Sequence, residues 1–224
     1  MDKKLFVPLV ALTLALFIYT PIAIARAPYE STMLLVQKIF YYHFATWMAG
    51  ALAVVICGAA SAVYLFRGTP RADRVASASA ELVVIFCAFG LVSGTLWGRK
   101  AWGTWWSGDA RLIMALVAEL IFCGYLLLRK YGGPGTEKLA AAMGVFGAAT
   151  APFVYKSVDW WRTMHPKTTV VSTLNQTAGG AIMWDVVLIC TATFLLWCVV
   201  LLMARVRLED LRAEVDQLYL AAED

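Results

Sequence analysis

Residues 181–204 read AIMWDVVLICTATFLLWCVVLLMA and contain one charged side chain, Asp185, close to their start. The hydrocarbon core of a bilayer is crossed by a helix of about 20 apolar residues, so this run is long enough to span it. The stretch therefore predicts a membrane-spanning helix, with Asp185 solvated at the membrane boundary.

Five further segments have a similar length and apolar character, at residues 5–25, 43–66, 81–98, 112–129 and 139–155. Hydrophobic residues make up 61% of the chain and charged residues 15%, whereas soluble domains have about 45–50% and about 25%. The mean hydropathy of the chain, +0.71, agrees with this high share of hydrophobic residues. We predict an all-α integral membrane protein, a bundle of six transmembrane helices formed by residues 1–204, followed by a tail of residues 205–224.

The first apolar segment could be taken for a secretory signal, because Lys3 and Lys4 precede it and the sequence Ala23-Ile24-Ala25 resembles a cleavage site. Its apolar run is longer than the roughly 7–15 residues of a signal sequence. We therefore expect a retained first helix.

Basic residues indicate which helix ends face the cytoplasm, since cytoplasmic loops are enriched in Lys and Arg. If the N-terminus is inside, 11 of the 19 basic residues lie inside, and both termini are cytoplasmic. The net charge of +4 is small and spread along the chain, which gives no support for a nucleic-acid partner. The inner set is Lys3, Lys4, Arg67, Arg71, Arg74, Arg129, Lys130, Lys138, Arg205, Arg207 and Arg212.

The tail has a pattern of its own. Leu208, Leu211, Val215 and Leu218 recur at spacings of three and four, with acidic residues between them. This pattern predicts an amphipathic helix, suited to a partner or to the membrane surface on the inner side.

A tryptophan-rich segment, WGRKAWGTWWSGDAR at residues 97–111, joins the third and fourth predicted helices on the outer side. Four of the nine tryptophans of the chain fall within ten residues of each other, interleaved with glycine. Indole rings on a glycine-permissive backbone suit a flat apolar ligand, and tryptophan also favours the membrane–water boundary. We expect this segment to form a platform at the interface.

The chain has two histidines, and the predicted topology puts both on the side of this platform. A single histidine at a helix end is usually an interfacial residue, but His43 and His165 together match the need of haem iron for two axial nitrogens. Arg99, Lys100 and Arg111 could pair with the haem propionates. Zinc fits less well, because its usual four ligands are incomplete here.

The five cysteines, in contrast, fall inside predicted spans at spacings that match no metal motif, and we expect them to pack as small residues. The chain has no C-x-x-C-H motif, so it does not attach a c-type haem of its own. The five cysteines are Cys57, Cys87, Cys123, Cys190 and Cys198.

Taken in order, these motifs resemble those of the haem exporter protein C family (CcmC) of cytochrome c maturation, part of a haem-handling superfamily marked by a WWD loop. Residues 97–98, 102–106 and 109–112 match that loop. Residues 160–165 resemble a second family motif, and His43 followed by Trp47 resembles the first histidine segment. The family usually has Trp immediately before the Asp of the loop, where this chain has Gly108.

The resemblance implies a non-enzymatic protein of the bacterial inner membrane that holds haem b at the outer face, with His43 and His165 as axial ligands. It also implies delivery of haem to a periplasmic haem chaperone (CcmE-like). The other implied partners are an ABC transporter pair (CcmA/CcmB-like), a small membrane subunit (CcmD-like) and membrane lipid. The other site residues that it implies are Trp97, Trp102, Trp105, Trp106, Asp109, Arg111, Trp160 and Trp161.

Three alternatives remain. The nearest is a related cytochrome c assembly protein of CcsA or CcmF type, but such relatives usually have more helices and four histidines. A membrane b-type electron carrier with two haems would need histidine pairs at two depths, whereas both histidines are predicted at one depth. A transporter gated by the Trp segment would require polar residues along several spans, where Glu119 stands almost alone.

Overall fold

The computed structural model describes residues 3–29, 33–165 and 180–223. Six of its helices are long and apolar enough to cross a membrane, so the predicted all-α bundle with six spans is confirmed. A short 3-10 helix, η1 (Leu35–Lys38), precedes the second of them. The six are α1 (Lys3–Arg26), α2 (Ile39–Arg67), α3 (Pro70–Ala101), α4 (Ala110–Tyr131), α5 (Glu137–Trp160) and α7 (Gly180–Glu223).

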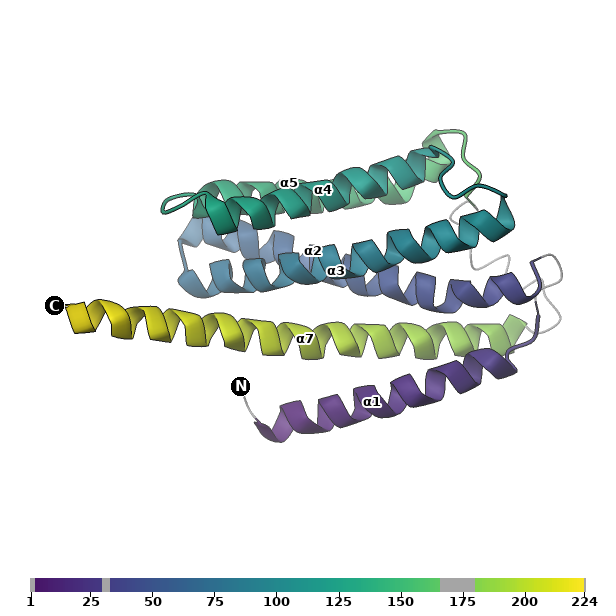
Figure 1. The fold of residues 1–224 in the computed structure, drawn as a ribbon, viewed down its shortest axis with the longest axis horizontal. Helices are drawn as coiled ribbons and strands as arrows, with labels where there is room; N and C mark the ends of the chain where they lie inside the picture. Colours follow the sequence, from purple (N-terminus) through teal and green to yellow (C-terminus); the bar gives the residue numbers. More distant parts are fainter. Residues whose placement is uncertain (1–2, 30–32, 166–179, 224) are drawn as a thin grey trace.

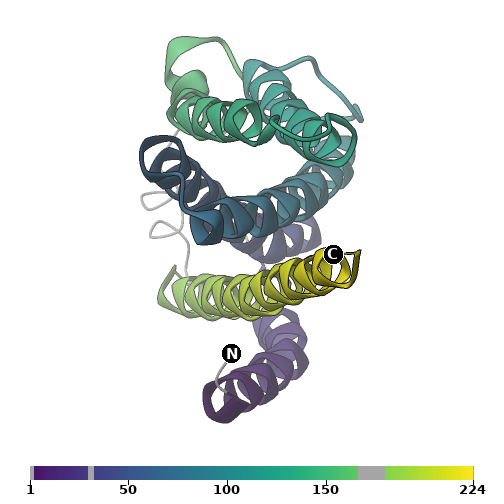
Figure 2. The same ribbon diagram turned by 90° about the vertical axis from the view of Figure 1, so that its left-hand side faces the viewer.

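The helices run side by side along the long axis of the molecule and form successive layers (Figure 1). Figure 2 shows α4 and α5 in one layer, α2 and α3 in the next, then α7, with α1 outermost. Helix α2 is central and contacts α3, α5 and α7, whereas α1 packs mainly on α7. Phe17 of α1 meets Phe194 and Trp197 of α7 with ring centroids 5.4 Å and 5.2 Å apart.

Small residues bring α2 and α5 close together. A Cβ atom at Gly58 of α2 would lie 2.4 Å from the Cβ of Ala148, and one at Gly144 of α5 would lie 2.3 Å from the Oγ of Ser61. Membrane helices associate through such close approaches, because lipid gives no hydrophobic drive between them. All five cysteines lie in helices and carry free thiols, and four of them are buried, in agreement with a packing role.

We expect Gly58→Ala to destabilise the protein by about 1–3 kcal/mol, because the added methyl group collides with α5. Gly124→Ala is the matched control: the only atom within 4 Å of its added Cβ is the flexible end of Met143. Alanine is also the better helix former, so this variant should be neutral or slightly more stable. Equilibrium unfolding in detergent measures both, and an equal effect of the two substitutions would contradict a close α2–α5 contact.

Helix α3 begins at Pro70, eleven residues before the predicted span at 81. Proline at the first turn favours a helix start, and Asp73 and Arg74, which follow it, pair with neighbouring helices. Asp73 forms a two-point ion pair with Arg129 of α4. The connection between the predicted spans 43–66 and 81–98 is therefore helical from Pro70 onward.

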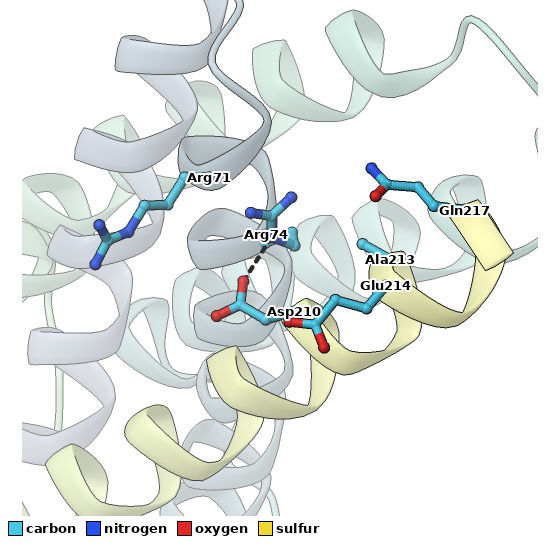
Figure 3. A pocket seen from close by; sticks show the side chains of 6 residues that line it. All are labelled: Arg71, Arg74, Asp210, Ala213, Glu214 and Gln217. Atoms are coloured by element: carbon cyan, nitrogen blue, oxygen red, sulfur yellow. Dashed lines mark hydrogen bonds and ion pairs between the residues drawn. The ribbon is translucent and has the colours of Figure 1, made fainter. Parts of the chain in front are cut away.

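The last helix does not end with the apolar span. The predicted span 181–204 and the predicted amphipathic helix form one continuous helix, α7, because residues 205–223 contain no Gly or Pro to break it. Arg205 pairs with Glu81 of α3, and Arg74 Nε lies 2.7 Å from Asp210 Oδ1. Figure 3 shows this second pair beside a hollow of about 420 Å³ between α3 and α7. The division between residues 1–204 and a tail thus coincides with no break in the helix and remains a prediction.

Candidate functional site

The candidate site residues lie at the end of the bundle that is at the right in Figure 1, where α1 ends and α7 begins. Helices α2 and α4 begin there, and α3 and α5 end there. This arrangement brings His43 near the start of α2, Trp97 near the end of α3, Asp109 just before α4 and His165 just after α5 to the same end of the molecule. Both chain termini lie at the opposite end. The membrane face to which each end belongs remains a prediction.

His43 lies between α2 and α3 among aromatic rings. Its ring centroid is 5.6 Å from that of Trp97 and 6.2 Å from that of Trp47. Two glycines of α3 make room for this arrangement. A Cβ at Gly94 would lie 3.1 Å from Cε1 of His43, and one at Gly90 would lie 2.6 Å from the indole of Trp47.

A serine of α3 contacts His43 and favours one placement of its proton. His43 Nδ1 lies 2.9 Å from Ser93 Oγ, and that hydroxyl donates its single hydrogen to the carbonyl of Phe89 at 2.8 Å, a contact that it extends to Gly90 O at 3.1 Å. When Ser93 donates to Phe89 O, its oxygen can accept a hydrogen bond from Nδ1–H of the imidazole. A neutral His43 with its proton on Nδ1 satisfies all of these contacts, and this tautomer has a free lone pair on Nε2.

The Trp-rich loop leaves α3 through a tight turn. The N–H of Trp102 donates to Gly98 O at 2.8 Å, and the Trp102 ring lies 3.3 Å from where a Cβ of Gly98 would be. Gly103 has a φ of 77°, in the left-handed region that favours glycine. Arg99 donates to Gly103 O and also lies 6.0 Å from the centroid of the Trp105 ring.

Gly108 explains the departure from the family pattern. Its φ is 66°, and it directly precedes Asp109, the N-cap of α4. An L-residue in this conformation costs about 1–2 kcal/mol. The loop of this chain therefore takes a path that suits glycine and disfavours the tryptophan usual at this place.

Asp109 ties two segments together. As the N-cap of α4, its Oδ1 accepts the N–H of Arg111 at 2.9 Å. Its Oδ2 accepts the hydroxyl of Thr163 and, at 2.7 Å, the N–H of Met164. Burial raises the pKa of Asp109, but these hydrogen bonds outweigh burial and hold the pKa below its ordinary value. Asp109 is thus an anion that fastens the segment after α5 to the start of α4.

His165 lies on this fastened segment. Its ring centroid is 5.1 Å from that of Trp102, and its Nδ1 is 3.5 Å from Asp109 Oδ1. Burial lowers the pKa of His165, and the Asp109 charge offsets only part of this effect. The imidazole is therefore neutral at pH 7. His43 lies within electrostatic range of both His165 and Arg111, which places the three groups in one region.

The remaining tryptophans differ in their placement. Trp97 is half-buried, and its Nε1 is buried without an acceptor among the described residues. Trp105 and Trp106 are 58% and 41% exposed. Trp160 and Trp161 are exposed and pair with each other at 5.9 Å, and no ring contact between them and His165 is found among the described residues.

Two residues that help to position the site were not identified from the sequence. Ser93 lies one helical turn before Trp97 and thus on the same face of α3, a spacing that could have shown it. Thr163 precedes His165 by two residues and carries no such signal, because its role depends on the approach of Asp109 from another helix.

The protein has six spans, and two imidazoles and several indoles lie at one end of its bundle. These features define a class of protein. It is a polytopic helical membrane protein with a candidate site for a flat, metal-containing ligand at one end of the bundle.

Comparisons with known proteins identify the family. A family model described as Heme exporter protein C (CcmC) matches residues 1–221. The Heme exporter protein C of Bradyrhizobium diazoefficiens is 32% identical over 197 residues, or 87% of this chain and 74% of that protein. That of Haemophilus influenzae is 28% identical over 98% of this chain and 89% of its own length. That of Escherichia coli K12 is 31% identical over 59% of this chain and 55% of its own length. The chain belongs to the Heme exporter protein C family.

Proposed function

We propose that this chain handles haem in the maturation of c-type cytochromes, holding haem b between Nε2 of His43 and Nε2 of His165. The observation that carries the proposal is the approach of the two histidines from separate helices to one end of the bundle, each ring beside a tryptophan. The names of the relatives support haem as the ligand.

The side chains at this end fit haem. Both imidazoles turn Nδ1 toward a polar partner, which leaves Nε2 for the metal, as ligating histidines normally do. Haem supplies an iron atom with two axial positions and two anionic propionates. Arg111 is a half-buried cation near both histidines, and we assign it to a propionate. The indoles of Trp97 and Trp102 border the two imidazoles and exclude water from the metal bonds.

The exposed part of the loop suits delivery. Trp105 and Trp106 present indole faces to the outside, and such faces can hold the porphyrin edge or receive a partner. We assign them to the transfer of haem to a periplasmic chaperone of CcmE type, with CcmA/CcmB-like and CcmD-like subunits as the remaining partners. Trp160 and Trp161 form a second exposed aromatic surface at the same end.

In this proposal the site end faces the periplasm, and both termini face the cytoplasm. Reporter fusions after Pro70 and Gly133 should therefore score as cytoplasmic, and fusions after Thr104 and Met164 as periplasmic. If fusions after Thr104 and Met164 score on opposite faces, one shared site is impossible.

The direct test is the optical spectrum of the purified protein reconstituted with haem b. Two histidine ligands give a six-coordinate, low-spin spectrum in both oxidation states. A five-coordinate spectrum of the parent protein would contradict ligation by both histidines.

A further inference from the structure

The two imidazoles of the candidate site have unequal partners. His43 Nδ1 donates to the neutral hydroxyl of Ser93 at 2.9 Å, and that hydroxyl is itself committed to a helix carbonyl. His165 Nδ1 faces Asp109 Oδ1, an oxygen of a carboxylate, at 3.5 Å. His43 thus has a weak hydrogen-bond acceptor as its outer partner, and His165 has a strong one.

The carboxylate of Asp109 is held firmly for this role. Its side chain is 3% exposed and accepts three hydrogen bonds, from Thr163, Met164 and Arg111. These three hydrogen bonds leave Asp109 Oδ1 able to accept a further one from His165. Nδ1 of His165 has no closer acceptor among the described residues. A metal bound at Nε2 makes Nδ1–H more acidic, so ligation would strengthen and shorten this contact.

On the basis of the function proposed above, we propose that Asp109 and Ser93 are positioning residues that make the two axial bonds to haem iron unequal. His165, supported by the carboxylate of Asp109, is the ligand that is retained. His43, supported only by the hydroxyl of Ser93, is the ligand that dissociates first when haem leaves for its acceptor.

The physical basis is the effect of the outer partner on ligand basicity. A carboxylate that accepts from a ligating histidine raises the basicity of the imidazole and strengthens its metal bond, and loss of such a partner typically costs about 10–100-fold in metal affinity. A neutral hydroxyl that is already engaged polarises the ring far less. When the weaker bond, to His43, breaks first, one axial position opens for an incoming ligand. The bond to His165 still holds the haem.

Carbon monoxide distinguishes the two ligands, because it replaces the weaker axial ligand of ferrous haem. The C–O stretching frequency then depends on the imidazole that remains on the opposite side of the iron. The experiment compares the CO complexes of the haem-loaded, dithionite-reduced parent and its variants by infrared spectroscopy. The complex of His43→Ala should have the parent frequency, because His165 is the remaining ligand in both. The complex of His165→Ala should have a different frequency.

The positioning residues give a second readout. Asp109→Asn should shift the C–O frequency and weaken haem binding by about 10–100-fold. Ser93→Ala should leave the frequency unchanged and speed CO binding by about 2- to 12-fold, as expected for the loss of one neutral hydrogen bond. The histidine comparison keeps the test decisive even if Asp109→Asn disturbs the loop that its carboxylate fastens.

Failure of this inference differs from failure of the proposed function. If His165→Ala retains the parent frequency and His43→Ala changes it, His43 is the retained ligand and the inference is overturned. If Asp109→Asn is folded and its frequency equals that of the parent, Asp109 does not support the retained ligand. If neither histidine variant changes the haem spectrum before CO is added, ligation by these histidines fails altogether.

Discussion

His43→Ala and His165→Ala should each strongly reduce the haem bound by the purified protein and convert the haem that stays bound from a six-coordinate, low-spin form to a five-coordinate form. The reason is that each substitution removes a metal–nitrogen bond, a larger loss than the about 10–100-fold that removal of an outer partner costs. Haem content per mole of protein and the optical spectrum in both oxidation states measure the effect. The amount of protein in the membrane should stay at the parent level, because both residues lie near helix ends and neither is fully buried.

Cys57→Ala is the matched control. Cys57 is a fully buried residue of the same helix as His43, and its thiol donates to Ala76 O at 3.4 Å. Its replacement by alanine tests whether an ordinary change in α2 disturbs haem binding. Parent-like haem content in both histidine variants would rule out axial ligation by these two residues.

The general architecture could be predicted from the sequence because it depends on composition alone. Six apolar runs of sufficient length must each become helical, since lipid leaves no partner for an unpaired backbone group. Successive spans then alternate in direction, which brings the start of α2, the end of α3 and the end of α5 to the same side. The approach of His43 and His165 to one end follows from that alternation.

Helix ends at the opposite side could not be predicted in the same way. The predicted span limits at residues 66, 81 and 204 mark where apolar residues give way to charged ones. Charged side chains begin at these points, but both helices continue. Residues 205–223 contain no Gly or Pro, and Arg74 of α3 pairs with Asp210 of α7. Hydropathy locates the membrane boundary of a helix and not its end.

The role of Asp109 could not be predicted from the sequence either. The sequence analysis grouped it with Arg111 as a contact for haem, whereas the structure places its carboxylate in a buried set of hydrogen bonds to Thr163 and Met164. Those partners lie 54 and 55 residues away in the chain, so only the packing of α4 beside α5 could reveal them.

Trp105→Ala or Trp106→Ala should separate the holding of haem from its delivery. Both side chains are exposed, and neither makes a ring contact with His43 or His165 among the described residues. Loss of one stacked indole costs about 0.5–1.5 kcal/mol beyond the lost contact area, far less than loss of an axial nitrogen. These variants should therefore retain haem with a six-coordinate spectrum but load a co-expressed haem chaperone poorly. The measurement is covalent haem on the chaperone relative to haem retained by this protein.

Tyr131→Ala is the control for this experiment, because Tyr131 is an aromatic residue, 70% exposed, at the end of the bundle opposite to the Trp-rich loop. It should load the chaperone as the parent does. If the Trp105 and Trp106 variants also load the chaperone at the parent level, these indoles serve only as anchors in the membrane interface, where tryptophan is common. If they lose their own haem as completely as the histidine variants do, the two indoles belong to the holding site, and a separate delivery surface on this loop is excluded.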